Sequence, residues 1–506
     1  MKKKQRKNKK LMKKNDAFRL LNFKNLKMEI NGYGYHYSIR SFMLQLIISF
    51  VIILIAGLIC NLDWIPIMCL MIVGALVTPY IILAQFQFLY EENRFSNAVN
   101  YMTQMIYSFK KTPKIINALQ DTLTISDAKL AALVQYAIDY IEEGVYEEDL
   151  YKEALEPLEK EYGSDRMTTL HNYFMHVEKV GGEYRNGLNL VLNDIQGWTE
   201  RTYCYQKDRK NLKFKAIISI VLCLAICAVF VNLLPEQFSI SGFAIYQIMT
   251  AVLLSIFIFL YAIIQSKLNG SWLTKTKYLS DKQVEYNKIT STGMNLKSDY
   301  GRVIPALIVS LFGVFLFLSQ KKYPFVFLCV GLSGFLAYFP LFKIKQAKKT
   351  IKKEIEKCFP DWIRELSLNL QMQNVYVAIK ETTPTTPYIL RIELEHLLKR
   401  INEDPLSIKP FNDFMKGYDV SELTANMSMI YSLNKYGKAD AEKQINSLIE
   451  RNDKLLEKSE MLKNKDEIGV TGFVLAVIPE IFTVIKLLVD MILMLITFMA
   501  MTQAVM

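Results

Sequence analysis

The sequence predicts an all-α membrane protein with about eight transmembrane helices and two helical-bundle domains on the cytoplasmic side. Apolar residues are gathered into blocks long enough to cross a bilayer, and long charged segments separate these blocks. The charged segments repeat their apolar residues at helical spacing and contain no convincing alternating strand pattern. The composition agrees, because 51% hydrophobic and 22% charged residues are too apolar for an average soluble protein and too charged for a purely embedded one.

The first 42 residues form a basic arm that begins MKKKQRKNKKLMKK and accounts for much of the net charge of +12. A basic arm could bind nucleic acid, but a positive flank ahead of an apolar block normally holds the N-terminus in the cytoplasm. We therefore expect no nucleic-acid partner. No small-residue cleavage site follows the late apolar block, so it is not a signal peptide. The abundance of Lys, Ile and Asn hints at a bacterium, and the plasma (inner) membrane is the expected location.

Seven apolar blocks lie at 43–60, 64–86, 216–234, 243–265, 303–318, 325–342 and 468–506. A spanning helix needs about 20 residues. The last block is almost twice that length and contains Pro479, Lys486 and Asp490, so we predict two crossings there. Lys486 and Asp490 can pair on one helix face, and closeness to the outer turn of that last hairpin would explain them. The total is then eight crossings, arranged as four hairpins.

Within each pair the connection is short, whereas the stretches between pairs are long and rich in Lys and Arg, which places those stretches in the cytoplasm. Lys321 and Lys322 fall on the outer side, outweighed by KIKQAKKTIKK at 343–353, a segment expected to meet anionic lipid headgroups. The predicted order is a basic arm (1–42), hairpin 1 (43–86), helical domain 1 (87–213), hairpin 2 (214–265), linker (266–302), hairpin 3 (303–342), helical domain 2 (343–467) and hairpin 4 (468–506).

In this order the same unit of hairpin, domain and hairpin occurs twice, which predicts an internal repeat. Five short matches follow one another in the same order in both halves. They pair Phe95 with Phe359, Ala118–Thr122 (ALQDT) with Ala378–Thr382 (AIKET), Gly181 with Gly437, Glu200-Arg201 with Glu450-Arg451, and Leu234–Phe238 (LPEQF) with Ile478–Phe482 (IPEIF).

Both domains are predicted to be helix bundles. Residues 128–141 (AKLAALVQYAIDYI) carry apolar side chains at three- and four-residue spacing. The second domain repeats the pattern at Ile445, Leu448, Ile449, Leu455 and Leu456.

The segment Gly182-Glu-Tyr-Arg-Asn-Gly187 has the glycine spacing of a phosphate-binding loop. Such a loop needs Lys and Ser or Thr after its second glycine and a strand before its first. Here Leu188 and Asn189 follow, and a helical stretch precedes. We therefore exclude nucleotide binding and predict a structural turn at Gly181 and Gly182, with a counterpart at Gly437. Glycine readily adopts the left-handed conformation that ends a helix, and Asn186 is a fair N-cap for the next one.

This helix–glycine–helix element, with Glu178-Lys-Val-Gly181, Leu188–Leu192 and charged residues leading into an apolar block, resembles the F-domain proteins of type II secretion and type IV pilus machines. The hairpin–domain–hairpin unit is similar to the tight-adherence (Flp pilus) B and C proteins, and the chain resembles two such units in tandem. In the second unit, Asn434 stands where the first has Glu178. The resemblance implies an inner-membrane platform that couples a cytoplasmic hexameric secretion ATPase to assembly of a pilin or pseudopilin, contacts membrane lipids and forms homo-oligomers.

No catalytic, metal-binding or cofactor-binding motif is recognisable, so the sequence predicts neither enzymatic activity nor a cofactor. The histidines are scattered, with His171 and His176 on different faces of a helix. Five of the seven cysteines lie in apolar blocks, where small core residues are expected.

An acidic run at 139–165 includes Glu142, Glu143, Glu147 and Glu148. It is open to three interpretations: a solvated helix face, a docking face for a basic partner, or a divalent-cation site. Docking of the ATPase on those four glutamates is the functional hypothesis.

The alternative function is the permease subunit of a transporter, since repeats and eight crossings also suit transport. Against it, the apolar blocks carry almost no polar residues to bind a solute. A membrane-bound signalling enzyme is a third option, with no motif behind it.

Overall fold

The computed structural model describes residues 19–505 apart from 145–149, 182–183, 236–238, 268–271, 274–277, 295, 320–322, 372, 419 and 434–437. All regular structure in the described residues is helical, as the periodicity predicted. Lys321 and Lys322 lie outside the described residues.

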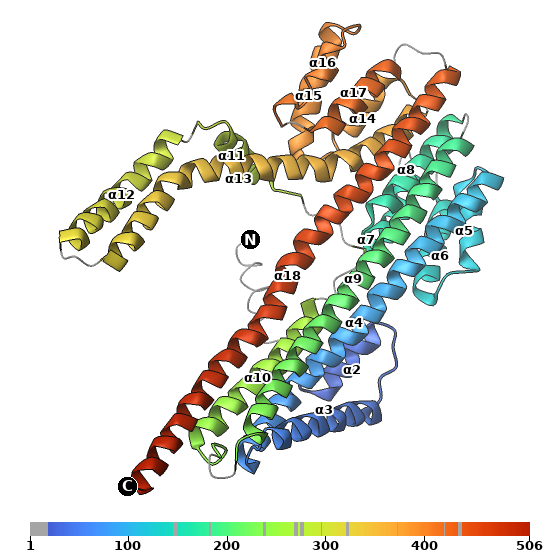
Figure 1. The fold of residues 1–506 in the computed structure, drawn as a ribbon. Helices are drawn as coiled ribbons and strands as arrows, with labels where there is room; N and C mark the ends of the chain where they lie inside the picture. The colour runs from blue at the N-terminus through green and yellow to red at the C-terminus, as the bar shows by residue number, and fades with distance from the viewer. Residues whose placement is uncertain are drawn as a thin grey trace, which may run out of the picture. The chain divides into compact units, whose positions relative to one another are not determined.

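Seven helices in the described part of the chain are long and apolar enough to cross a membrane (Figure 1). The chain is therefore a multi-pass membrane protein. The seven are α3 (Ile39–Ile59), α4 (Trp64–Lys111), α9 (Arg185–Asn232), α10 (Ala244–Lys267), α12 (Leu296–Ser319), α13 (Tyr323–Leu370) and α18 (Lys438–Val505).

The prediction of a fourth hairpin at 468–506 is wrong, because one continuous helix, α18, contains the whole apolar tail to Val505. Pro479 lies inside this helix. A proline removes one helical hydrogen bond but does not by itself reverse the chain. The apolar span Gly472–Ala500 has 29 residues, which makes it longer than one crossing requires and shorter than two crossings with a turn.

The same helix corrects one of the five repeat matches. Pro235 follows the end of α9 at Asn232, whereas Pro479 is inside α18. The two prolines of this match are therefore not equivalent in structure.

Four long helices pass through the predicted borders between membrane and polar domains. α4, α9 and α13 each have 48 residues, and α18 has 68. Each combines an apolar stretch with a charged one in a single helix, so the borders expected near residues 86, 213, 342 and 467 are changes of composition along a helix and not ends of elements.

The helices form two compact units, which also differ from the predicted domains. The first unit contains residues 1–168, 195–274 and 464–506, and the second contains 169–194 and 275–463. Segment 169–194 of predicted domain 1 thus belongs with predicted domain 2, and the apolar tail belongs with the first unit.

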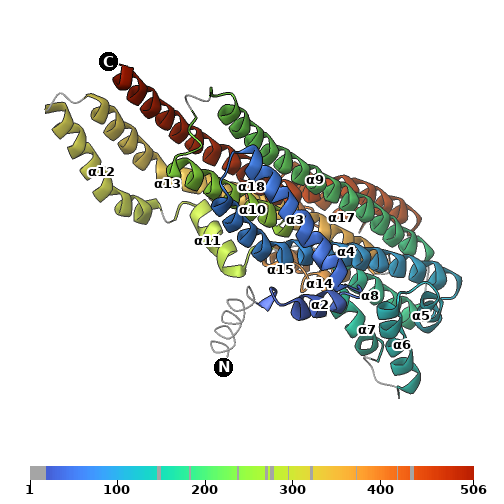
Figure 2. The same cartoon turned by 90° about the horizontal axis from the view of Figure 1, so that it is seen from below.

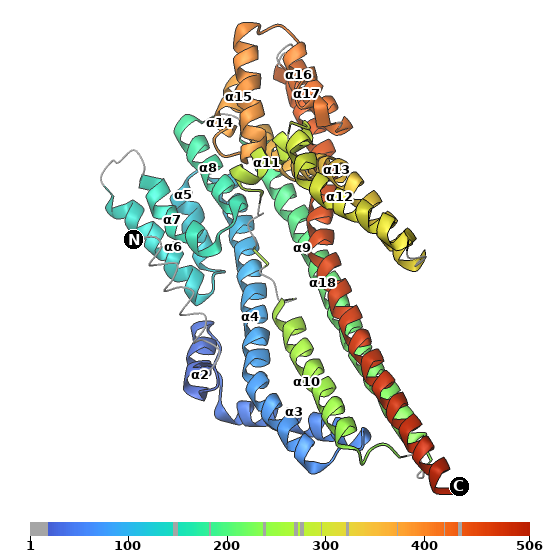
Figure 3. The ribbon, with the colours of Figure 1, turned by 90° about the vertical axis from the view of Figure 1, so that its left-hand side faces the viewer.

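In the first unit, α3, α4, α9, α10 and the last part of α18 share an apolar core (Figure 3). Its fully buried members include Ile67, Leu70 and Ile264. Further along α4, the short helices α5 (Ile115–Leu123), α6 (Ala128–Glu143) and α7 (Leu150–Tyr162) follow one another, each packed on the one before. α6 confirms the helix predicted at 128–141. A short helix near the start of the chain, α2 (Phe23–Gly32), buries Leu26 and Ile30 against α4.

In the second unit, α12 packs against α13 (Figure 2), and the other end of α13 enters a core with α14 (Val375–Thr382), α15 (Tyr388–Glu403), α17 (Ser421–Leu433) and the start of α18. Two short turns, α16 (Lys409–Asn412) and η2 (Lys416–Tyr418), connect α15 to α17. Ile445 and Leu448 are buried in this core, as the spacing predicted.

Most of the predicted linker 266–302, from residue 275 onward, is part of the second unit. It contains α11 (Asp281–Ser291), which packs on α13 and α15 and buries Val284 in the core. The Leu279 amide donates to Glu354 Oε1 at 2.6 Å, and Lys288 pairs with Glu393 at 2.9 Å. α11 was missed because its sequence, DKQVEYNKITS, has only two aliphatic residues and therefore almost no apolar periodicity.

Candidate functional site

The predicted glycine turn follows α8 (Asp165–Val180). Gly181 has a φ of 74°, and its amide donates to the Val177 carbonyl at 2.8 Å, so it has the left-handed conformation that was predicted. Gly182 and Gly437 lie outside the described residues. α9 begins at Arg185, which places Asn186 in its first turn and not at the N-cap position predicted for it.

Gly187 has a different role, namely close packing between α8 and α9. A Cβ atom at this position would clash with the Tyr173 hydroxyl. The Tyr173 hydroxyl donates to the Tyr184 carbonyl at 3.3 Å, on the other side of the turn. Gly181 and Gly187 thus shape a helical hairpin, and neither is arranged as part of a phosphate loop. The sequence indicated the first role but not the second, because Tyr173 is brought to Gly187 only by the fold.

The acidic run is divided between paired and exposed side chains. Glu153 accepts from Tyr140 Oη at 2.6 Å, and Glu161 pairs with Lys129 at 2.5 Å. The hydrogen bond from Lys129 holds the pKa of Glu161 below its usual value, against partial desolvation that acts to raise it. Glu142 and Glu143 are exposed at the end of α6, whereas Glu147 and Glu148 lie outside the described residues.

A buried ion pair lies near the middle of the apolar span of α18. Lys486 and Asp490 are one helical turn apart, with Nζ and Oδ2 at 2.5 Å, and their exposed fractions are 1% and 0%. Nζ also lies 4.7 Å from the centre of the Tyr246 ring on α10. The Tyr246 hydroxyl donates to the Cys60 carbonyl at 2.7 Å.

This pair corrects a sequence-based explanation. Its charges were attributed to an outer turn within the last hairpin, and α18 has no such turn. A charge inside an apolar bundle is costly unless it is paired. Pairing along one helix together with the Tyr246 ring accounts for these two residues.

Polar side chains also join the turn between α3 and α4 to the turn between α9 and α10. Gln247 accepts from the Asp63 amide at 2.9 Å and donates to the carbonyls of Asn61 and Ser241 at 3.1 and 2.7 Å. Asn232, at the end of α9, donates to the Ile59 carbonyl at 3.0 Å. These bonds satisfy backbone groups that helix ends leave without partners, and they hold the two turns together.

A second charged cluster lies in the other unit, around Arg364 of α13. Its guanidinium lies 3.6 Å from Asp361 and 3.8 Å from Asp194, which is on the first turns of α9. Tyr278 Oη donates to Asp361 at 2.6 Å, and burial together with Asp361 raises the pKa of this phenol. These contacts join the 169–194 segment to α13. Sequence reasoning missed the cluster, because its members come from three distant segments.

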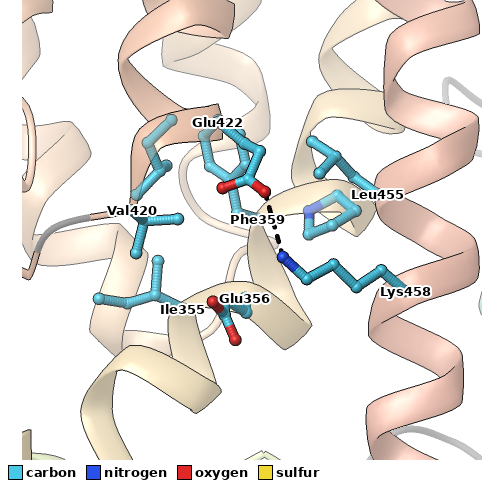
Figure 4. Close-up of a pocket in the computed structure, with 9 residues that line it drawn as sticks. Ile355, Glu356, Phe359, Val420, Glu422, Leu455 and Lys458 are labelled. Atoms are coloured by element: carbon cyan, nitrogen blue, oxygen red, sulfur yellow. Dashed lines mark hydrogen bonds and ion pairs between the residues drawn. The ribbon is translucent and has the colours of Figure 1, made fainter. Parts of the chain in front are cut away.

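A groove lies between α13, α17 and α18 (Figure 4). Its floor is apolar, formed by Ile355, Phe359 and Leu423. Across its rim, Lys458 pairs with Glu422 at 3.1 Å. The groove holds no arrangement of nucleophile and base.

No group of three or more His, Cys, Asp and Glu side chains capable of holding a metal ion occurs in the described residues. His171 is fully buried in α8.

We expect substitution by alanine to reduce the stability of the protein by different amounts at Gly181 and at Gly187. Gly181→Ala meets no atom within 4 Å, so only the left-handed backbone opposes it, and the expected loss of stability is about 1 kcal/mol. Gly187→Ala forces the Tyr173 ring to move and should cost about 1–3 kcal/mol. Thermal unfolding of the detergent-purified protein measures both. A smaller loss for Gly187→Ala than for Gly181→Ala would contradict the close-packing role.

We expect the losses of stability caused by substituting Lys486 and Asp490 to be strongly non-additive. Lys486→Met or Asp490→Leu alone leaves one uncompensated buried charge and should cost about 3–5 kcal/mol, whereas the double variant should unfold close to the parent. The control is Glu156→Gln, which breaks an exposed pair with Lys160 at 2.7 Å and should change stability by less than about 0.5 kcal/mol. Additive losses in the double variant would mean that the two charges act independently.

Comparisons with protein-family models, curated proteins and solved structures find no match to this chain.

Proposed function

We propose that this protein is a non-enzymatic platform of a pilus or type II secretion-like machine in a bacterial inner membrane. It would couple a cytoplasmic hexameric secretion ATPase to the assembly of a pilin or pseudopilin, with membrane lipids and further copies of itself as its other partners. The observation that carries the proposal is that α4, α9, α13 and α18 each join an apolar span to a polar helical bundle without a break. A displacement of either bundle is then a displacement of membrane helices.

The internal repeat, which the resemblance requires, is supported by the order of elements. α4 and α13 have equal lengths, and so do α6 and α15, with 16 residues each. α5 and α14 follow the long helices at similar distances, and both bury the ALQDT/AIKET match: Ala118, Leu119 and Thr122 are fully buried, as are Ala378, Ile379 and Thr382. α8 and α17 then lead into α9 and α18.

The helix order also adjusts one match proposed from sequence. Counting back from α5 and α14 aligns Phe95 with Ile355, and both are fully buried. Phe359 is one helical turn further along α13. In the repeat that we propose, equivalent positions of the two halves are therefore alike in their burial more than in their residue types.

The permease alternative has one observation in its favour, since intramembrane charges often line a solute path. Lys486 and Asp490, however, neutralise each other and are covered by Tyr246. They serve better as a link between helices than as a binding site for a solute, so the platform is the better-supported function.

Seven crossings predict that the two termini lie on opposite sides of the membrane. With the basic arm in the cytoplasm, the C-terminus should be outside. Alkaline phosphatase fused after Met506 should be active in intact cells, whereas a fluorescent protein fused there should remain dark. Bright fluorescence at this position would instead indicate a cytoplasmic C-terminus and therefore an even number of crossings.

Cys204 gives an independent control of this orientation. It is exposed and should react with a membrane-impermeant thiol reagent only after the membrane is opened. Cys358, the other polar-segment cysteine, is fully buried in the second core and is unsuitable as a reporter.

The acidic run predicts where the ATPase docks. Replacing Glu142, Glu143, Glu147 and Glu148 by Gln should weaken ATPase binding by about tenfold at low salt, because one-signed charge speeds encounter and orients the partner. Added salt should weaken binding to the parent far more than binding to the variant. Binding is measured with the purified proteins, and piliation should fall while protein level stays constant.

Glu156→Gln is the matched control, because Glu156 is an exposed acid of the same run that already pairs with Lys160. This control should bind the ATPase like the parent. If the quadruple variant also binds as tightly as the parent, the run is a solvated face and the docking hypothesis is lost.

A further inference from the structure

We propose that the first unit binds an anionic phospholipid through its headgroup, at a site formed by Gln206, Lys210 and Lys213 of α9 and by Trp272. The ligand is a phosphodiester whose headgroup carries a hydroxyl group, and it belongs to a membrane lipid such as phosphatidylglycerol. The depth of the site rests on the membrane crossings described above, but not on the platform function.

Three membrane helices change from apolar to polar at this level. The apolar stretch of α9 begins at Ala216, three residues after Lys213, and that of α4 ends at Phe86, two residues before Phe88. Trp272 follows the end of α10 at Lys267. Headgroups lie where spans leave the hydrocarbon, and Trp, Lys and Arg are enriched at that depth.

The four residues are brought together by contacts and by helix geometry. Tyr203, Gln206, Lys210 and Lys213 are spaced by three or four residues and therefore follow one face of α9. At one end of this stripe, Tyr203 contacts Trp272 edge-on, with ring centroids 5.5 Å apart. At the other, Lys210 and Lys213 lie 5.6 and 5.1 Å from the Phe88 ring.

Phe88 closes this arrangement, since its ring centroid is 5.8 Å from that of Trp272. Two lysines and Trp272 thus contact the Phe88 ring, and Gln206 lies between Tyr203 and Lys210 on the same face of α9. An ammonium group carries three donors, so contact with an aromatic face does not prevent it from binding an anion.

Buried polar atoms without a hydrogen-bond partner provide separate evidence for a ligand at this site. Gln206 is only 2% exposed, yet neither its Nε2 nor its Oε1 has a hydrogen-bond partner in the described part of the chain. The Nε1 of Trp272, whose side chain is 4% exposed, also has none there. Buried polar groups are normally satisfied, so these atoms indicate a missing partner.

The chemistry of these groups selects the partner. Gln206 Nε2, Trp272 Nε1 and the two ammonium groups are donors, which suit the non-bridging oxygens of a phosphodiester. Gln206 Oε1 is an acceptor and requires a hydroxyl or amine hydrogen, which a glycerol headgroup supplies. Two positive charges favour a lipid with net negative charge over a zwitterionic one.

The test uses the full-length protein purified in detergent, with phosphatidylglycerol and phosphatidylcholine as probes. Retained lipid is counted by native mass spectrometry, and quenching of tryptophan fluorescence is followed during titration. Phosphatidylglycerol should bind at least about tenfold more tightly than phosphatidylcholine. Lys210→Met and Lys213→Met should each weaken it by about fivefold, since a lysine near a headgroup contributes on that order.

Matched variants separate the site from general charge and from misfolding. Lys215→Met removes an exposed lysine from the opposite face of α9 at nearly the same depth and should bind phosphatidylglycerol like the parent. Trp272→Phe keeps an aromatic ring at this position and removes the Nε1 donor together with part of the indole, so it should fold and bind several-fold more weakly. Gln206→Leu should reduce the preference for phosphatidylglycerol over phosphatidic acid, which lacks the headgroup hydroxyl.

The alternatives give distinct results. Equal binding of the two lipids, or equal losses in Lys213→Met and Lys215→Met, would overturn the site. Glycerol phosphate that stabilises the protein as well as the lipid does would instead indicate a soluble phosphate ligand, and the lipid assignment would fail. Because none of these measurements uses the ATPase or a pilin, their outcome is independent of the platform proposal.

Discussion

The structure depends on the continuity of its long helices. Inside a bilayer every backbone N–H and C=O must be satisfied within the chain, so a span has to be helical. Here the helical hydrogen bonding does not stop at the membrane edge in α4, α9, α13 and α18. At about 1.5 Å per residue, the 68 residues of α18 form a rod roughly 100 Å long. A rod of this kind moves as one body along its length unless it bends, and Pro479 marks the position where α18 lacks a hydrogen bond.

A rod transmits force only if its sides are held, and the side contacts of these helices are specific. Lys486 and Asp490 place charges where they are stable only against each other and the Tyr246 ring, which fixes the rotation of α18 about its axis. In the other unit, Arg364 can satisfy Asp194 and Asp361 only while the first turns of α9 lie beside α13. Gly187 permits the approach of Tyr173 that a side chain would prevent. Apolar packing tolerates sliding more readily than these contacts do, so we infer that they set the register of the rods.

The sequence predicted those parts of the fold that depend on local composition. Apolar blocks identified six of the seven spans individually, and apolar periodicity identified α6 and the start of α18. Prediction from the sequence failed where the structure depends on contacts between residues that are distant in the chain. The last block was divided because its length resembles two spans, although Lys486 and Asp490 are spaced to pair along one continuous helix. α11 was taken as linker because its stability comes from contacts with α13 and α15. The role of Gly181 could be predicted from its position after a helix. The roles of Arg364 and Gln206 could not, because they depend on which residues the fold places beside them.

The division of the chain into units bears on how the proposed platform would work. If the proposed repeat consisted of two independent modules, each unit would contain one uninterrupted half of the chain. Instead, residues 169–194 of the first half belong to the second unit, and residues 464–506 of the second half belong to the first. α9 and α18 therefore each contribute to both units, and the divisions at Asp194 and Asn464 lie inside helices. Any change in the arrangement of the two units must bend, rotate or shift these two helices. In a platform driven from one cytoplasmic contact, this exchange would pass a displacement received by one half of the repeat to the membrane helices of the other, which two separate modules could not do.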